Sequence, residues 1–243
     1  MKLDILAIGA HPDDVELACS GILILHKQLG YKTGVIDLTR GELGTRGTAE
    51  TRDIESAKAA EILGLDMRMN LRFRDGFFQN DETHQLALMK MIRKYQPNIV
   101  LINAPHDRHP DHGKGAALAK DTCFLAGLSK IETELDGENQ KAWRPKRVFH
   151  YIQDIHIEPH IIIDVTPVFE QRMESIRAYA SQFYNENYDG PKTYISSNNF
   201  MNYIESRCRD FGKRIGTEYG EGLVTTAGFG LKSFDDMVLP EFS

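Results

Sequence analysis

Hydrophobic and polar positions follow two alternating patterns along the first two thirds of the chain. Short apolar runs predict buried strands over residues 3–9, 31–39, 67–73, 98–104, 147–154 and 160–166. Longer stretches with apolar residues three or four positions apart predict helices over residues 15–30, 48–64, 82–95 and 111–127. Such alternation favours a mostly parallel sheet with helices on both faces. We therefore predict an α/β fold of the Rossmann-like type.

The remaining segments are less regular. Helical patterns cover residues 166–183 and 198–216, residues 217–231 read as irregular or strand structure, and residues 129–146 read as a polar excursion loop. We see no repeated segment longer than a tripeptide and no linker. The prediction is a single domain of residues 1–243, with a Rossmann-like core over residues 1–165 and a helical and irregular C-terminal part over residues 166–243.

Charge and cysteine content narrow the possible partners. The 243 residues carry a formal net charge of −6, which gives no reason to expect nucleic acid or an anionic membrane as a partner. Cys19, Cys123 and Cys208 are widely scattered, which argues against a disulfide framework and a thiolate metal site. The N-terminus does not resemble a signal peptide, and no apolar run approaches the roughly 20 residues that span a bilayer. We expect a soluble cytoplasmic protein.

The tripeptide His-Pro-Asp occurs twice, at residues 11–13 and 109–111. Each copy follows a predicted strand and precedes a predicted helix. In the strand order 3-2-1-4-5 of a Rossmann-type half, the first and fourth strands are neighbours. Right-handed crossovers bring their carboxyl ends to one edge of the sheet, where ligands bind in such folds. We predict an active site at the C-terminal edge of these two strands.

Each copy alone has a purely structural interpretation. Proline suits the first turn of a helix, which makes each histidine a capping or pre-helical residue, and acidic residues there favour the helix dipole. Together, the copies bring several metal-capable side chains to one crevice: His11, Asp14, His109 and His112, with the carboxylates of Asp13 and Asp111 beside them. Nitrogen and oxygen ligands without cysteine suit a catalytic zinc site with three protein ligands. Spacing alone does not decide which candidate stays outside the metal.

The segments "AHPDDVELACSG" and "HPDH" resemble the two signature motifs of the LmbE-like (PIG-L) zinc deacetylase family, which removes acetyl groups from N-acetylglucosamine (GlcNAc) derivatives. Residues 37–64 resemble the subgroup that deacetylates N-acetylglucosaminyl malate in bacillithiol biosynthesis. The similarity runs from residue 3 to about residue 165. Many family members read H-P-D-D-E, whereas Val15 here separates Asp14 from Glu16, as it does in that subgroup.

The resemblance implies a role for each motif residue. His11, Asp14 and His112 are the implied zinc ligands, although Fe²⁺ or Mn²⁺ also suits two histidines and one carboxylate. Asp13 is the implied general base. His109 is implied to be a protonated imidazole that faces the oxyanion, oriented by the carboxylate of Asp111. The resemblance also implies a homo-oligomer, a trimer or a hexamer.

The loop between residues 40 and 52 supplies candidates for substrate binding. Malate carries two carboxylates, which arginine binds bidentately, so we expect Arg46 and Arg52 to contact substrate. Glu42 is a candidate acceptor for a sugar hydroxyl, and Arg144 is a weaker candidate of the same kind as the loop arginines. The alternative interpretation is a solvated loop whose charges pair with one another, and a surface or packing role for Arg144.

The resulting hypothesis is a metal-dependent N-deacetylase of a small GlcNAc conjugate, most simply N-acetylglucosaminyl malate. A second hypothesis keeps the site but changes the substrate to another GlcNAc conjugate or a chitooligosaccharide. A third is a non-catalytic, Rossmann-like protein that binds a sugar or nucleotide. The third is disfavoured because the first strand is not followed by the G-x-G-x-x-G motif that binds dinucleotides.

Overall fold

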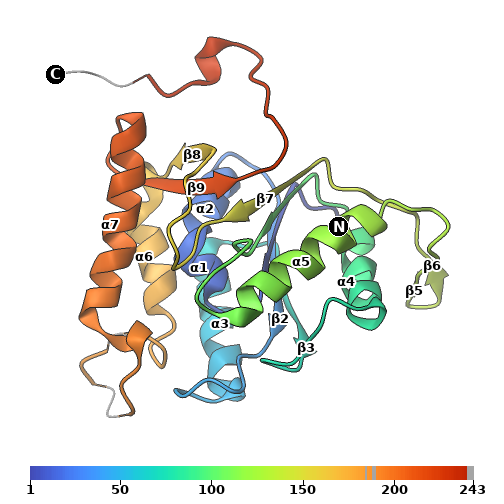
Figure 1. The fold of residues 1–243 in the computed structure, drawn as a ribbon, viewed down its shortest axis with the longest axis horizontal. Helices are drawn as coiled ribbons and strands as arrows, with labels where there is room; N and C mark the ends of the chain where they lie inside the picture. The colour runs from blue at the N-terminus through green and yellow to red at the C-terminus, as the bar shows by residue number, and fades with distance from the viewer. Residues whose placement is uncertain (184, 188–189, 240–243) are drawn as a thin grey trace.

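A seven-stranded, mostly parallel sheet forms the centre of the fold, in the strand order β3-β2-β1-β4-β7-β9-β8 (Figure 1). The computed structural model describes residues 1–183, 185–187 and 190–239. The strands are β1 (Ile5–Gly9), β2 (Thr33–Thr39), β3 (Met67–Phe73), β4 (Ile99–Ile102), β7 (Arg147–Tyr151), β8 (Ile161–Asp164) and β9 (Gly220–Val224). β1 pairs in parallel with both β2 and β4. The predicted α/β class and the predicted contact between the first and fourth strands are confirmed.

The far edge of the sheet differs from a simple parallel order. β9 lies within residues 217–231, for which the sequence predicts irregular or strand structure. It runs antiparallel between β7 and β8. Two glycines allow this insertion. A Cβ at Gly220 would lie 2.7 Å from Ile162, and one at Gly222 would lie 2.9 Å from the ring of Phe211. The C-terminal part of the chain therefore completes the central sheet.

Helices cover both faces of the sheet, as predicted. They are α1 (Asp14–Ala18), α2 (Ser20–Gln28), α3 (Ala49–Leu63), α4 (Glu82–Tyr95), α5 (Pro110–Leu125), α6 (Phe169–Arg177) and α7 (Asn198–Ile215). Ile5 and Ala7 of β1 face a core shared with α2, α3, α6 and α7, whereas Leu6 and Ile8 face a core shared with α4 and α5. Figure 1 shows α6 and α7 on one side of the sheet and α4 and α5 on the other. Burial on both faces explains the continuous apolar runs of the strands.

The predicted helix over residues 15–30 is wrong in one respect, because it is broken into α1 and α2. Cys19, between the two, has φ −147° and ψ 18°, which is not a helical conformation. The polar loop over residues 129–146 carries a small antiparallel pair, β5 (Glu134–Leu135) and β6 (Glu138–Asn139). The described residues also form three short 3₁₀ turns: η1 (Thr166–Val168), η2 (Tyr194–Ser196) and η3 (Phe234–Asp236).

The predicted C-terminal part packs on the same core as the N-terminal elements. α6 and α7 contribute Met173, Ile176 and Ile204 to the core that contains Ile5 of β1. Residues 184, 188–189 and 240–243 of this predicted part lie outside the described residues. Within the described ranges, no helix has the length and apolar character needed to cross a bilayer.

Candidate metal centre and substrate cavity

A cavity of about 310 Å³ opens at the C-terminal edge of β1 and β4. Its walls come from both His-Pro-Asp segments, from the loop after β2, and from C-terminal residues between 182 and 207. The convergence follows from the parallel sheet, because strands β1 and β4 end side by side. The cavity therefore lies at the sheet edge where the sequence predicts the active site.

The two His-Pro-Asp copies start their helices differently. His109 is the N-cap of α5, Pro110 is its first residue, and the Asp111 backbone N–H donates to His109 Nδ1 at 3.2 Å. In the first copy the N-cap is instead Asp13, with φ 112°, so His11 is a pre-helical residue and Pro12 lies before the helix, not in its first turn. A positive φ at a residue other than glycine is strained and is found where the surroundings enforce it. The turn places consecutive carboxylates, Asp13 and Asp14, against the cavity.

Asp14 lies between the two histidines that the family resemblance identified with it as ligands. Its Oδ1 lies 3.0 Å from His112 Nε2, and its Oδ2 lies 3.7 Å from His11 Nδ1. The amides of Asn103 and Gln153 donate to the same carboxylate at 3.0 and 3.1 Å. The structure thus brings the three expected ligands together and fixes the central one with further hydrogen bonds.

A second carboxylate holds the far side of each imidazole. Asp107 Oδ2 lies 2.6 Å from His112 Nδ1, and Asp75 Oδ1 lies 3.0 Å from His11 Nε2. Metal-binding histidines are typically oriented by such a carboxylate on the nitrogen that does not bind the metal. Neither Asp75 nor Asp107 belongs to the His-Pro-Asp motifs, and neither was predicted from the sequence. Their positions in the chain are suggestive, because Asp75 follows the end of β3 and Asp107 lies two residues before the second His-Pro-Asp copy.

The carboxylates control the protonation of these imidazoles. Burial alone would lower the pKa of His112, but Asp14 and Asp107 outweigh it and raise that pKa to about 9. The pKa of His11 is also raised, against its burial, by Asp111, Asp14 and Asp75. Burial likewise opposes ionisation of Asp14, yet the two histidines hold its pKa well below the ordinary value. The site concentrates negative charge around two imidazoles, which is the environment that a divalent cation would neutralise.

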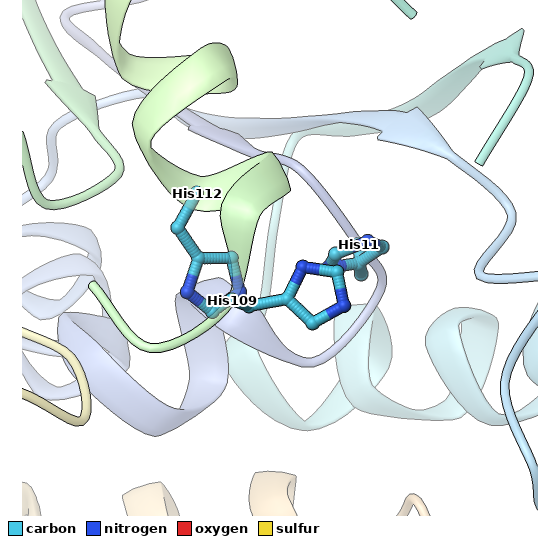
Figure 2. A group of neighbouring side chains, drawn as sticks. All are labelled: His11, His109 and His112. Atoms are coloured by element: carbon cyan, nitrogen blue, oxygen red, sulfur yellow. The ribbon is translucent and has the colours of Figure 1, made fainter. Parts of the chain in front are cut away.

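Figure 2 shows His109 beside His11 and His112, all three pointing into one space. Their nearest ring nitrogens lie within 4.8 Å of one another, so three histidines form a second possible donor set. Burial, together with the neighbouring His11 and His112, lowers the pKa of His109 to about 4. Because the Asp111 N–H donates to Nδ1, the proton of the neutral ring resides on Nε2. The structure therefore favours a neutral donor over the expected protonated imidazole.

The carboxylate of Asp111 has a different partner from the expected one. It accepts from the Gly76 backbone N–H at 2.8 Å, lies 2.6 Å from Lys114 Nζ and lies 3.4 Å from His11 Nε2. Burial opposes its ionisation, but His11 and Lys114 lower its pKa well below the usual range. Asp111 therefore orients His109 through its backbone N–H, while its carboxylate supports His11.

Asp13, the expected general base, is buried next to a guanidinium. Its Oδ2 lies 3.1 Å from Arg52 Nη1, and the same Nη1 donates to the Pro12 carbonyl at 2.8 Å. Burial raises the pKa of Asp13 to about 7, with Arg52 acting in the opposite direction. A carboxylate with a pKa near neutrality is well matched to accepting and returning a proton.

The predicted substrate residues divide into two groups. Arg46 and Arg52 line the cavity. Both also make hydrogen bonds within the protein, and Arg46 Nε donates to the Ser181 carbonyl at 2.7 Å. Glu42 is exposed and accepts from the Asp75 backbone N–H at 2.8 Å, so it supports a ligand-orienting residue and is not in the cavity lining. The expected sugar contact is therefore not supported.

Arg144 lies away from the cavity. Its Nη2 donates to the Phe124 carbonyl at 3.0 Å, and its guanidinium stacks 4.1 Å from the Phe124 ring, at the end of α5 remote from the motif. The packing interpretation therefore holds for Arg144. Arg40, in the loop, pairs with Asp53 and Glu50, as the charge-pairing alternative expects.

The C-terminal wall of the cavity consists of residues that the sequence did not predict as part of the site. Gln182, Tyr194, Phe200, Ile204 and Arg207 all line it. Gln182 accepts from Arg52 and donates to the Arg46 carbonyl, which ties this wall to the arginine loop. No local pattern marks these residues, because their contacts bridge more than a hundred positions of the chain.

Comparison with known proteins identifies the family of this chain. The family described as "PIG-L: GlcNAc-PI de-N-acetylase" matches residues 6–123, a range that contains both motifs. The chain belongs to the PIG-L family. The resemblance drawn from the motifs is thereby confirmed, and with it membership of a family of deacetylases that act on GlcNAc-type substrates.

Two deacetylases to which this PIG-L family member is similar are named after a substrate. It is 26% identical over 234 residues to a diacetylchitobiose deacetylase of Thermococcus kodakarensis, covering 90% of this chain and 81% of the relative. It is 27% identical over 195 residues to a probable N-acetyl-alpha-D-glucosaminyl L-malate deacetylase 2 of Bacillus anthracis, covering 74% and 81%. Among solved structures, the conserved protein TT1542 from Thermus thermophilus superimposes with a TM-score of 0.83 at 34% identity, covering 95% and 98%.

Proposed function

We propose that this protein is a divalent-metal-dependent N-deacetylase of a small GlcNAc conjugate, with N-acetylglucosaminyl malate as the first candidate. One observation carries the proposal. The Asp14 carboxylate lies between two imidazoles that are each backed by a further carboxylate, and the buried Asp13 lies directly beside it. This is the donor arrangement of a catalytic metal site with an adjacent base.

His11, Asp14 and His112 would hold the metal. Two nitrogens and one carboxylate suit Zn²⁺, and they also accommodate Fe²⁺ or Mn²⁺. When bound, such an ion lowers the pKa of a water molecule and polarises the amide carbonyl of the substrate. Asp75 and Asp107 hold the outer nitrogens of the two imidazoles, which would leave the opposite ring nitrogens free for a metal.

Asp13 moves the proton in the proposed reaction. Its carboxylate accepts a proton from the attacking water as the water oxygen bonds to the amide carbon. It then returns that proton to the amide nitrogen, the C–N bond breaks, and acetic acid and the free amine leave. The acid passes its remaining proton to solvent or to the released amine and becomes acetate. Arg52, 3.1 Å away, holds the Asp13 carboxylate in place through both directions of transfer.

His109 stabilises the negative charge that develops on the amide oxygen. The Asp111 N–H fixes its tautomer, so Nε2–H is available to donate a hydrogen bond. A neutral imidazole is an adequate donor for this purpose, and a donor aimed at a developing oxyanion typically contributes about 10²–10³ in rate.

The cavity wall indicates how a conjugate would bind. Leu17, Phe200 and Ile204 give an apolar surface, while Arg46 is the cationic lining residue that we assign to an anionic aglycone. A volume of about 310 Å³ lies at the small end of the range for ligand sites, which suits a monosaccharide with a short aglycone. Diacetylchitobiose is the alternative substrate, since a relative carries that name.

The test couples metal analysis to acetate release. The purified protein is expected to hold about one divalent ion per chain and to release acetate from N-acetylglucosaminyl malate or, failing that, from diacetylchitobiose. Full activity after thorough demetallation would contradict the proposal, as would the absence of acetate release from every GlcNAc conjugate tried. The ratio of kcat/KM between the two substrates identifies the aglycone.

The assembly and location of the protein stay predictions. A trimer or hexamer is expected from the family resemblance, and sedimentation equilibrium would measure it. A cytoplasmic location is expected from the sequence, and fractionation of expressing cells would test it.

A further inference from the structure

The short helix that carries Asp14 ends at a break between α1 and α2. α1 has only five residues, and Cys19 separates it from α2. A helix this short is not stable by itself, because the first turn is costly to nucleate. The break also leaves backbone carbonyl and N–H groups that need partners outside the helices.

Two arginines from the C-terminal part satisfy the end of α1. Arg172 Nη2 and Arg207 Nη2 both donate to the Leu17 carbonyl, at 2.8 and 2.6 Å. Arg172 lies on α6 and is fully buried, and Arg207 lies on α7 and is 8% exposed. Cations at this position are favourable because the C-terminal end of a helix carries partial negative charge.

A carboxylate satisfies the start of α2 in the complementary way. Glu221 of β9 accepts from the backbone N–H groups of Gly21 and Ile22, at 3.1 and 2.8 Å. It also pairs with Arg172 Nε at 2.7 Å, and both side chains are buried. The C-terminal end of α1, which carries partial negative charge, is therefore bound by cations, and the N-terminal end of α2, which carries partial positive charge, is bound by an anion. All three side chains come from residues outside the 6–123 range of the family match.

Arg207 has a second contact that leads to the metal centre. Its Nη1 donates to the backbone carbonyl of Gln153. The Gln153 side chain donates to Asp14 Oδ1 at 3.1 Å and lies 3.4 Å from His112 Nε2. One guanidinium therefore holds both the helix that carries Asp14 and the residue whose amide touches Asp14 and His112.

We propose that Arg207, supported by Arg172 and Glu221, is a positioning residue for the metal centre. It sets the location of Asp14 relative to His112 without contacting either side chain. The inference rests on the proposed function, because it assumes that these two residues hold a metal. It also gives the C-terminal part of the chain a role at the metal centre, which the N-terminal motifs would not position by themselves.

The experiment compares zinc affinity between the full-length wild type and its variants. Demetallated wild type, Arg207→Met and Arg207→Lys are titrated with zinc against a chromophoric chelator, and kcat, KM and thermal unfolding are measured in parallel. Arg207→Met is expected to weaken zinc binding by about tenfold or more and to lower kcat more than it raises KM. Arg207→Lys keeps the charge but cannot reach both carbonyls, so an intermediate loss is expected.

The control is Arg209→Gln, an exposed position on the same helix, which is expected to bind zinc as the wild type does. Glu221→Gln keeps the shape and an acceptor oxygen, so a moderate loss of zinc affinity is expected; it carries the test if Arg207→Met does not fold. Wild-type zinc affinity in the folded Arg207 variants, with only a lower melting temperature, would overturn the positioning role. A wild type that binds no metal would instead overturn the proposed function itself.

Discussion

The Asp107 carboxylate lies 2.6 Å from Nδ1 of His112 and thereby directs the opposite ring nitrogen to Asp14, 3.0 Å away. Asp107 also accepts from the Ile155 backbone N–H at 2.7 Å, so the loop after β7 fixes the carboxylate in turn. The orientation of this imidazole is thus set by contacts that reach it from two loops at the sheet edge.

Replacement of Asp107 by alanine is expected to weaken metal binding by about 10–100-fold, because the imidazole loses its orienting partner. Asp107→Asn retains an acceptor oxygen and is expected to lose less. Zinc titration of both demetallated variants measures the difference. Equal affinity in the alanine variant and the wild type would show that Asp107 does not orient a ligand.

Asp13→Asn is expected to lower kcat by about 10²–10⁴-fold, because the amide cannot accept the water proton. Metal content should stay at the wild-type level, since the proposed ligands are untouched. Acetate release and metal analysis on one preparation measure both. A variant within a fewfold of wild-type kcat would exclude Asp13 as the base.

His109→Ala and His112→Ala distinguish the two possible donor sets. We expect His112→Ala to lose the metal, whereas His109→Ala keeps it and loses about 10²–10³ in kcat through the missing oxyanion donor. Metal analysis after dialysis provides the readout. If both variants lose the metal alike, the three-histidine set is the correct one and His109 is a ligand.

The demetallated protein is expected to lose stability as the pH rises from about 6.5 to 9. The pKa of His112 is raised from 6.5 to about 9, because Asp14 and Asp107 outweigh its burial, so the folded state binds more protons than the unfolded state in this window. This stabilisation is complete below pH 6.5 and is lost as the pH passes through about 9. Each kcal/mol lost lowers the melting temperature by about 2–4 °C.

Melting curves at pH 6, 7.5 and 9 test this pH dependence. His112→Gln should flatten the trend, and saturating zinc should flatten it as well, because the metal replaces the proton on the imidazole. A melting temperature of the demetallated protein that rises between pH 6.5 and 9 would contradict the proton linkage.

The variants Arg46→Gln and Arg144→Gln form a matched pair that tests substrate recognition. Arg46→Gln should raise KM for N-acetylglucosaminyl malate by about tenfold or more, since a charged hydrogen bond is lost, and should affect a neutral conjugate less. Arg144→Gln should change neither value, because that side chain packs on Phe124 at the far end of α5. The readout is the ratio of KM for N-acetylglucosaminyl malate to KM for the neutral conjugate, measured on one preparation. If Arg46→Gln leaves this ratio unchanged, Arg46 does not bind the anionic part of the substrate.

Local sequence was enough to predict the sheet centre and the motif residues. Buried parallel strands have continuous apolar sequences. A motif that directly follows such a strand must lie at the C-terminal edge of the sheet. For that reason His11, Asp14, His109 and His112 could be placed together from the motifs and their strands, whereas the choice of three ligands among them rested on the family resemblance. The broken helix after Asp14 could not be read in this way, because residues 15–30 keep a helical apolar pattern across the break.

Tertiary structure alone decided the remaining properties of the site. The lowered pKa of His109 depends on the burial and charge that surround it, and the contacts of Asp75 and Asp107 with the two imidazoles depend on how the loops pack. The break after α1 is held by arginines that lie 155 and 190 residues beyond Leu17. Sequence periodicity reports which face of an element is buried, but the partners of a buried polar group are set by how distant segments pack.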